Sequence, residues 1–157
     1  DMPEILVGRV ARLVGTDGNA KMSKSLGNVI YLSDTAEVVE KKVMGMYTDP
    51  NRKHTTDPGE VEGNPVFIYL DAFGQDQTRI AELKALYQQG KVGDVEVKRY
   101  LVQVLNQFLE PIRKRRAEYE TQPELVKQIL REGTLRAKSV VEETMQEVRS
   151  AMKLYML

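Results

Sequence analysis

Apolar residues recur at helical spacing along most of the chain, and this pattern begins after residue 33. Asp34 and Glu37 stand three positions apart, as in a capping box, and predict that a first helix begins here and ends before Asp49-Pro50. Further helices are expected over residues 66–73, 77–89, 94 to beyond 112, 123–133 and 134 to near the end of the chain. The sequence therefore predicts a mainly α fold.

The longest predicted helix begins at Asp94 and has one regular apolar face. Its apolar positions are spaced by three or four residues: Val97, Leu101, Val104, Phe108 and Ile112. Pro111 lies inside this segment, so we expect it to bend the helix or to remove one of its hydrogen bonds.

The last part of the chain is expected to form two helices separated by Gly133, a residue type that often ends a helix. A stripe of apolar residues on the final helix predicts its core-facing side: Val141, Met145, Val148 and Met152. We expect the predicted helices to form an antiparallel bundle.

The first 33 residues differ from the rest of the chain. Glycines punctuate two short apolar pieces, residues 10–14 and 29–32, on either side of a polar loop. A turn-rich connection with three prolines and two glycines follows over residues 48–65. The organisation we expect is the end of an α/β region over residues 1–33, followed by an antiparallel helical bundle over residues 34–157.

Composition narrows the possible functions. The 23 Lys+Arg balance the 23 Asp+Glu, so no overall field directs the chain to nucleic acid or membranes. The absence of cysteine excludes disulfides and thiolate metal sites, and His54 is the single histidine. No apolar run approaches the roughly 20 residues that span a bilayer. We therefore expect a cytoplasmic protein with no metal site and no membrane partner.

The polar loop at residues 21–25, Lys-Met-Ser-Lys-Ser, is the strongest candidate for chemistry. Lysine carries a compact charge on a flexible stem and serine adds neutral donors, which suits phosphates that gain charge during a reaction. A solvated polar loop is the alternative, because two lysines and two serines within five residues also occur by chance. The phosphate-loop consensus Gly-x-x-x-x-Gly-Lys-Ser/Thr is absent.

A resemblance favours the phosphate interpretation. The loop Lys21-Met22-Ser23-Lys24-Ser25 is identical to the second signature of the class I aminoacyl-tRNA synthetases. Asp17-Gly18 and Gly27-Asn28-Val29-Ile30 match its surroundings in the tyrosine and tryptophan branch. Later segments, in the same order, resemble the bacterial tryptophanyl-tRNA synthetases: Thr48-Asp49-Pro50-x-Arg52, Asp57-Pro58-Gly59, Asn64-Pro65-Val66-Phe67, Pro111-Ile112-Arg113 and Arg136-Ala137.

The resemblance implies an ATP-dependent enzyme that joins tryptophan to AMP, releases pyrophosphate and passes the acyl group to tRNA(Trp). Lys21 and Lys24 would hold the phosphates, Ser23 and Ser25 would support the loop or donate to phosphates, and Met22 would pack near the adenine. Mg²⁺ would accompany ATP without being held by this chain. Residues 1–33 would be the end of a Rossmann-like nucleotide-binding domain, and residues 34–157 the anticodon-recognising domain.

The same resemblance implies that part of the active site is missing. The family's first signature, of the His-Ile-Gly-His type, and its amino-acid pocket lie upstream of the lysine loop and are absent from this sequence. We therefore expect these residues alone to be inactive, although the full-length enzyme would be a homodimer. A tyrosyl-tRNA synthetase and a stand-alone helical RNA- or protein-binding module are the alternatives.

Basic residues outside the loop are candidates for tRNA contacts. Arg113, Lys114 and Arg116 belong to the densest basic run, for which a solvated helix end is the alternative. Arg52 and Lys53 lie in the turn-rich connection, where structural support is the alternative. The aromatic residues Phe67, Tyr69 and Phe73 could stack on unpaired bases, but a place in the core is favoured.

Overall fold

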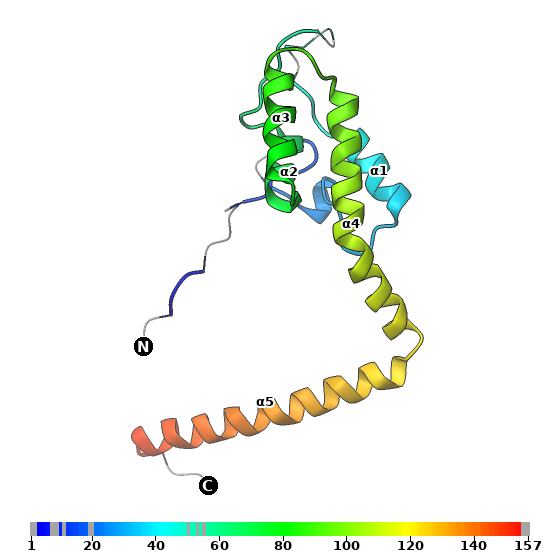
Figure 1. Ribbon diagram of the computed structural model, residues 1–157. Helices are drawn as coiled ribbons and strands as arrows, with labels where there is room; N and C mark the ends of the chain where they lie inside the picture. The colour runs from blue at the N-terminus through cyan, green and yellow to red at the C-terminus, as the bar shows by residue number, and fades with distance from the viewer. Residues whose placement is uncertain are drawn as a thin grey trace. The chain divides into compact units, whose positions relative to one another are not determined.

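The chain is helical wherever its regular structure is defined. A computed structural model describes residues 3–6, 10, 12–18, 21–49, 51–52, 54 and 56–154, and no strand occurs among them. Figure 1 shows the elements in order: a 3-10 turn η1 (Lys24–Leu26) and the helices α1 (Ala36–Met44), α2 (Pro65–Phe73), α3 (Gln77–Gln88), α4 (Asp94–Glu120) and α5 (Pro123–Ala151). The prediction of a mainly α fold is confirmed.

The chain divides into two compact units, Asp1–Arg113 and Lys114–Leu157. The first unit holds η1, α1 to α3 and most of α4, whereas the second holds the last turns of α4 together with α5. The domain boundary expected after residue 33 lies inside the first unit. The division into a nucleotide-domain end and an antiparallel bundle therefore stays a prediction.

The core of the first unit is built around α2, a helix that is apolar on nearly every side. Asn64 begins α2 by accepting a hydrogen bond from the Val66 N–H at 3.0 Å, and Pro65 occupies the first turn, where no donor is needed. Phe67 and Tyr69 are buried and Phe73 is half-buried, as the favoured interpretation of these aromatic residues predicted. Phe67 meets the Tyr87 ring of α3 edge to face, with ring centroids 5.0 Å apart.

The buried face of α4 differs from the predicted one. Its fully buried apolar residues are four positions apart: Val97, Leu101, Leu105 and Leu109. Val104 is only partly buried, and Phe108 keeps 43% of its surface exposed. After Leu101 the predicted positions Val104, Phe108 and Ile112 lie at the edge of the core instead of inside it. Both stripes are apolar, and the pattern alone does not show which one is more deeply buried.

The start of α1 also differs by one residue from the prediction. Thr35, not Asp34, is the N-cap, and its side chain accepts from the Val38 N–H at 3.4 Å. Asp34 instead accepts from the Tyr31 N–H at 2.8 Å and from Lys42 Nζ at 2.5 Å. The helix ends at Met44, several residues earlier than predicted, because Gly45 follows as the C-cap.

The structure has one continuous helix where two were predicted on either side of Gly133. The prediction of two helices was therefore wrong. Gly133 lies inside α5 and is not among the described glycines with positive φ. A glycine within a helix costs only about 1 kcal/mol relative to alanine, which the helix-forming neighbours offset.

The core-facing stripe predicted for the last helix meets no core within the second unit. No residue of α5 is buried, and its apolar stripe is exposed: Val141, Met145, Val148 and Met152. No helix in the described ranges is both long and apolar enough to span a membrane.

Lys98 is a buried cation that joins α4 to the end of α1. Its side chain donates to the carbonyl oxygens of Met44 at 3.0 Å and Met46 at 2.7 Å, and the residue is 6% exposed. Burial lowers the pKa of this lysine, and the charge of Asp94 partly opposes that shift. The lysine thus supplies donors to carbonyl groups that follow the last turn of α1.

We predict that Lys98→Met lowers the free energy of unfolding by about 1–3 kcal/mol, because two carbonyl groups lose their donor. Urea unfolding followed by circular dichroism measures this change. Lys91→Met, which alters an exposed lysine of the turn before α4, is the matched control. Equal unfolding midpoints for the two variants would contradict the bracing role of Lys98.

Candidate functional site

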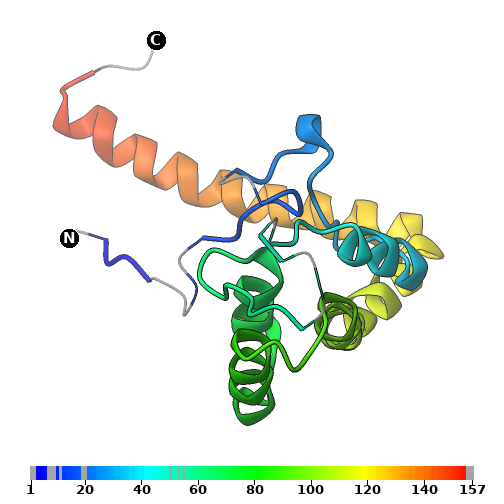
Figure 2. The same ribbon diagram turned by 90° about the horizontal axis from the view of Figure 1, so that it is seen from above.

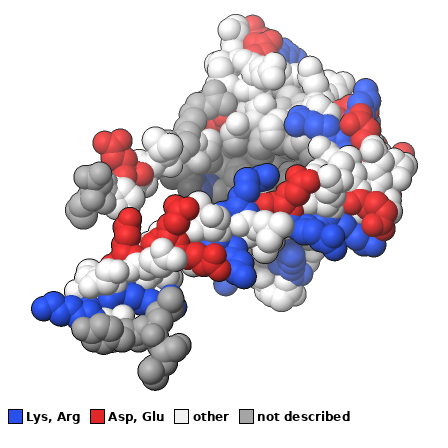
Figure 3. Space-filling view, turned by 90° about the horizontal axis from the view of Figure 1, so that it is seen from below, with Lys and Arg blue, Asp and Glu red and all other residues white. Residues whose placement is uncertain are grey.

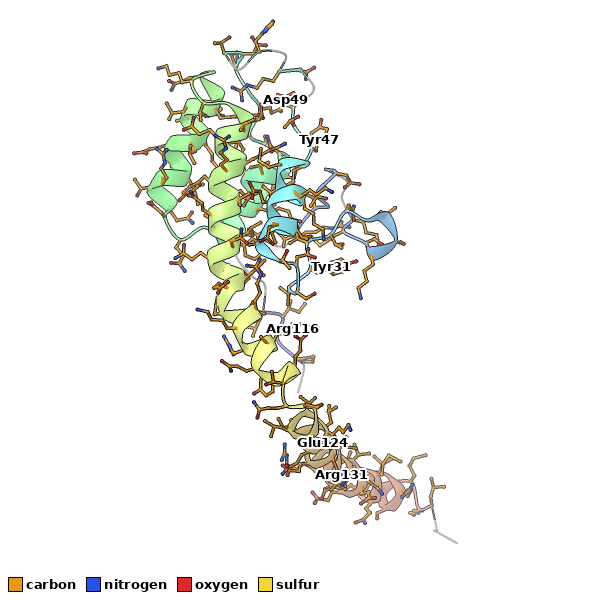
Figure 4. The ribbon with its side chains drawn as sticks, turned by 90° about the vertical axis from the view of Figure 1, so that its right-hand side faces the viewer. Tyr31, Tyr47, Asp49, Arg116, Glu124 and Arg131 are labelled. Carbon is orange, nitrogen blue, oxygen red and sulfur yellow. The ribbon has the colours of Figure 1, made fainter. Side chains whose placement is uncertain are left out.

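The lysine loop is a short exposed turn with defined ends. Ser23 has an extended backbone, η1 follows, and Gly27 closes the turn in the left-handed region with φ 67°. The N–H groups of Leu26 and Gly27 donate to the carbonyls of Ser23 and Lys24, both at 3.2 Å. Figures 2 and 4 show η1 projecting from the helices of the first unit. The loop therefore presents its tip to solvent.

The base of this turn is held by the side-chain amide of Asn28, a residue that is 3% exposed. Its Oδ1 accepts from the Ser23 N–H at 2.8 Å. Its Nδ2 donates to Asp17 Oδ1 and to the Lys21 carbonyl, each at 2.9 Å. One amide thus joins the segment before the loop, the start of the loop and the segment after it.

Small residues make room for this arrangement. A Cβ at Gly15 would lie 2.2 Å from Asn28 Nδ2, so no other residue fits there without displacing the amide. Thr16 donates to the Asn28 carbonyl at 3.0 Å, and its own carbonyl accepts from the Tyr47 N–H at 2.9 Å. Figure 4 shows Tyr47 on the segment that leaves α1. The base of the loop is therefore attached to the helical part of the first unit.

The side chains of the loop divide into exposed donors and one apolar anchor. Lys21, Lys24 and Ser25 are exposed, and the hydroxyl groups of Ser23 and Ser25 are 2.8 Å apart. Met22 is half-buried and packs against the core of the first unit. It lines an apolar cavity of about 140 Å³ with the following residues: Leu13, Ile30, Leu32, Tyr69, Phe73, Leu105, Phe108 and Leu109.

Tyr69 connects this cavity to the segment before the loop. Its hydroxyl donates to the Val14 carbonyl at 2.8 Å. Burial raises its pKa to about 12, and the negative charge of Asp17 adds to the shift. The neutral phenol is thus maintained as a donor at ordinary pH.

Arg52, a sequence candidate for tRNA contact, is held inside the first unit, with a side chain only 1% exposed. It donates to the carbonyls of Asp57 at 2.9 Å and Val92 at 2.5 Å, and its guanidinium lies 4.3 Å from the centre of the Tyr87 ring. The Tyr87 hydroxyl donates to Asp94 at 2.7 Å, and burial followed by this bond raises its pKa to about 12. This geometry matches the alternative of structural support. Lys53, its predicted companion, lies outside the described residues.

The basic run on α4 is not a uniform surface. Arg113 donates to the Asp34 carbonyl at 2.7 Å and to Asn106 Oδ1 at 2.8 Å, so it fastens α4 to the start of α1. Lys114 is exposed, and Arg116 pairs with Glu120 at 2.8 Å while both side chains are 60% exposed. Charges of both signs are interspersed on the face drawn in Figure 3. Arg113 is therefore held by partners within the first unit, whereas Lys114 and Arg116 are both exposed.

Sequence reasoning missed Asn28 as a member of the site, although it noted the residue as a flank of the loop. Asparagine after glycine is a common turn signal, and only the return of residues 15–17 shows what its amide contacts. Among the described residues, no group of three or more His, Cys, Asp or Glu side chains is arranged to hold a metal ion.

We predict that Asn28→Ala loosens the loop without unfolding the unit. Loss of the bond to the Ser23 N–H should raise the hydrogen-exchange rate of that amide about tenfold, since a net hydrogen bond is worth about 0.5–1.5 kcal/mol. Asn28→Asp should loosen the base further, because a carboxylate would face Asp17 and the Lys21 carbonyl. Asn51→Ala, on an exposed asparagine, should leave the exchange of residues 21–27 unchanged. Unaltered exchange in both Asn28 variants would refute the role of this amide.

Comparison with known proteins places the loop in a family. The family model for class I tRNA synthetases (W and Y) matches residues 2–110. A tryptophan–tRNA ligase from Treponema pallidum (strain Nichols) is 53% identical over 153 residues, which is 98% of this chain and 45% of that protein. The chain therefore spans less than half the length of the curated relatives it matches.

Solved structures agree with the family model. A tryptophanyl-tRNA synthetase from Campylobacter jejuni, complexed with ADP and tryptophan, is similar with a TM-score of 0.76 and 30% identity, over 93% of this chain and 44% of that one. A tyrosyl-tRNA synthetase from Archaeoglobus fulgidus, complexed with L-tyrosine, has a TM-score of 0.53 and 28% identity, over 66% of this chain and 34% of that one. The chain belongs to the class I tRNA synthetases of the tryptophan and tyrosine branch.

Proposed function

We propose that this chain serves as part of a tryptophan–tRNA ligase, to which it contributes the phosphate-handling loop and helices that recognise tRNA. The observation that carries the proposal is the exposed turn of Lys21 and Lys24, braced at its base by Asn28. The identity of 53% to a tryptophan–tRNA ligase supports tryptophan as the amino acid. Because the chain matches under half of that relative, the remaining active-site residues would lie in the unmatched part.

The reaction has a requirement that the loop can meet. In forming the adenylate, a tryptophan carboxylate oxygen bonds to the α-phosphorus of ATP while the bond to the β-phosphate breaks, and pyrophosphate leaves with the added negative charge. Lys21 and Lys24 would stabilise that charge, and the hydroxyls of Ser23 and Ser25 would add neutral donors. Mg²⁺ would enter with ATP. Lysines placed where charge develops contribute most in the transition state.

The backbone of the lysine loop suits a segment that closes over a triphosphate and reopens. Gly27 is left-handed with φ 67° on one side of the turn, and Gly18 has φ 81° before it. Between these glycines, the described part of the turn is held mainly at its base by Asn28. The tip would therefore move with the phosphates while its ends stay in place.

The helices would supply tRNA recognition, with residues 1–33 as the end of the nucleotide-binding domain and residues 34–157 as the anticodon domain. Lys114 and Arg116 are the exposed candidates for phosphate contact, whereas the guanidinium groups of Arg52 and Arg113 donate to main-chain carbonyls within the first unit. The complete enzyme would be a cytoplasmic homodimer that binds ATP, tryptophan and tRNA(Trp).

Two alternatives remain distinguishable. A tyrosyl-tRNA synthetase would share the loop, and the similarity to the Archaeoglobus fulgidus enzyme supports it less strongly, over 66% of this chain. A stand-alone helical module would bind RNA or protein without activating an amino acid. Each predicts a different substrate dependence in the same assay.

We predict that these 157 residues alone show no tryptophan-dependent exchange of pyrophosphate into ATP. Substituted for the matching residues of the Treponema pallidum ligase, they should support exchange. In that chimera Lys24→Ala should lower kcat by roughly 10²–10³-fold, because a donor to the developing charge is lost. Tryptophan affinity should change little.

Lys41→Ala, which removes an exposed lysine of α1, is the matched control and should leave exchange unaltered. Exchange that depends on tyrosine instead of tryptophan would favour the tyrosyl enzyme. A folded chimera without exchange for either amino acid would favour the stand-alone module. Exchange by the isolated chain would overturn the idea that the active site is shared with unmatched residues.

A further inference from the structure

The first unit contains a second recess, which shares Phe73 and Phe108 with the apolar cavity beside Met22 but differs from it in chemistry. It has a volume of about 280 Å³ and lies between the end of α2, the turn before α3 and one face of α4. Its lining combines aromatic rings with side-chain amides: Phe73, Gln75, Asp76, Tyr100, Gln103, Val104, Gln107 and Phe108. We call this recess the glutamine groove.

The polar groups of the glutamine groove are neutral and available. In the part of the chain that the structure describes, the side chains of Gln75, Gln103 and Gln107 have no hydrogen-bond partner, and all three are exposed. Asp76, the one charged residue of the lining, accepts from the Arg79 N–H at 2.9 Å as the N-cap of α3. A side-chain amide offers a donor and an acceptor side by side, which matches the edge of a nucleobase.

The aromatic residues of the groove form a platform. Phe73 and Phe108 have ring centroids 5.0 Å apart, and Phe108 keeps 43% of its surface exposed although its neighbour on α4, Leu109, is buried. Tyr100 is half-buried on the same helix. One exposed ring and two half-buried rings beside unpaired amides are a combination with which proteins bind unstacked bases of single-stranded RNA.

The placement of these residues makes the groove rigid. Tyr100, Gln103 and Gln107 are spaced by three and four positions, so they share one face of α4. The opposite side of the same turns carries Leu101 and Leu105 into the core. The amides of Gln103 and Gln107 are therefore held by a packed helix and not by a loop, which reduces the ordering that binding requires.

From this geometry we infer that the glutamine groove binds an unpaired base of the tRNA anticodon loop. The inference rests on the proposed function for the identity of the RNA, but on the groove's own lining for the chemistry. Among the described residues that line the groove there is no lysine or arginine, so it would read a base and not a phosphate. Arg99, exposed one helical turn before Gln103, would contact the adjacent phosphate.

The test uses the full chain and an RNA hairpin whose loop carries the tryptophan anticodon, with fluorescence anisotropy as the readout. Gln103→Ala and Gln107→Ala should each weaken binding at least about fivefold, and Phe108→Ala should weaken it similarly through lost stacking. Gln88→Ala, at the end of α3 and outside the groove, is the matched control and should bind as the unaltered chain does.

A second hairpin with abasic sugars in the loop separates base from phosphate contacts. It should bind more weakly than the intact hairpin and equally to the unaltered chain and the glutamine variants. Arg99→Ala should reduce the salt dependence of binding, whereas the glutamine variants should leave it unchanged. Urea unfolding of each variant shows whether it remains folded.

The inference is overturned if the folded glutamine variants bind the intact hairpin as tightly as the unaltered chain, or if the abasic hairpin binds equally well. It is also overturned if the unaltered chain does not bind the hairpin. The pyrophosphate exchange of the chimera contains no tRNA, so its loss would refute the proposed ligase without affecting these results. If the chimera exchanges pyrophosphate but the glutamine substitutions do not affect RNA binding, only the inference about the groove is refuted.

Discussion

The side-chain amide of Asn28 is the interaction on which the candidate site depends. It receives a bond from Ser23 and gives bonds to Asp17 and to the Lys21 carbonyl, so three parts of the loop's base meet at one buried group. A carboxylate would supply only acceptors there, and a hydroxyl could not span the same distances. Because all three bonds lie at the base, Lys21 and Lys24 remain exposed and can follow a ligand.

Several cations of the first unit stabilise the fold by donating to main-chain carbonyls. Lys98 serves the end of α1, Arg52 connects the turn-rich loop to the segment before α4, and Arg113 fastens α4 to Asp34. Each one satisfies carbonyl groups outside the regular helical bonding, where an unpaired group would be costly. The presence of a basic residue in this chain is therefore no evidence of RNA contact until the partners of its side chain are known. The lysines of the loop are exposed, and this distinguishes them from the three cations that donate to carbonyl groups.

The sequence predicts those features that depend on neighbouring residues. The bounds of α2 and α3 were predicted to within one residue, because apolar spacing and capping signals are local. The break at Gly133 was wrong because a weak local preference was given more weight than the continuous helical pattern around it. The exposure of the α5 stripe and the role of Asn28 depend on which distant segments pack nearby, and neither spacing nor motif contains that information. The lysine loop itself was located by its motif.

The two proposed recognition elements of the first unit, the lysine loop and the glutamine groove, differ in their mechanical support, and the proposed chemistry of each requires that difference. A polyphosphate changes its charge and position during reaction, so long cationic side chains on a turn between left-handed glycines can follow it. A nucleobase presents a fixed pattern of donors and acceptors, so amides on a packed helix such as α4 distinguish it best when they do not move. The first element is held through Asn28 and the second through Leu101 and Leu105, but Met22 of the loop and Phe108 of the groove line the same apolar cavity. Lys24 and Gln103 are exposed side chains outside that cavity, so amino-acid activation and RNA reading would be separable by substitutions at these two positions.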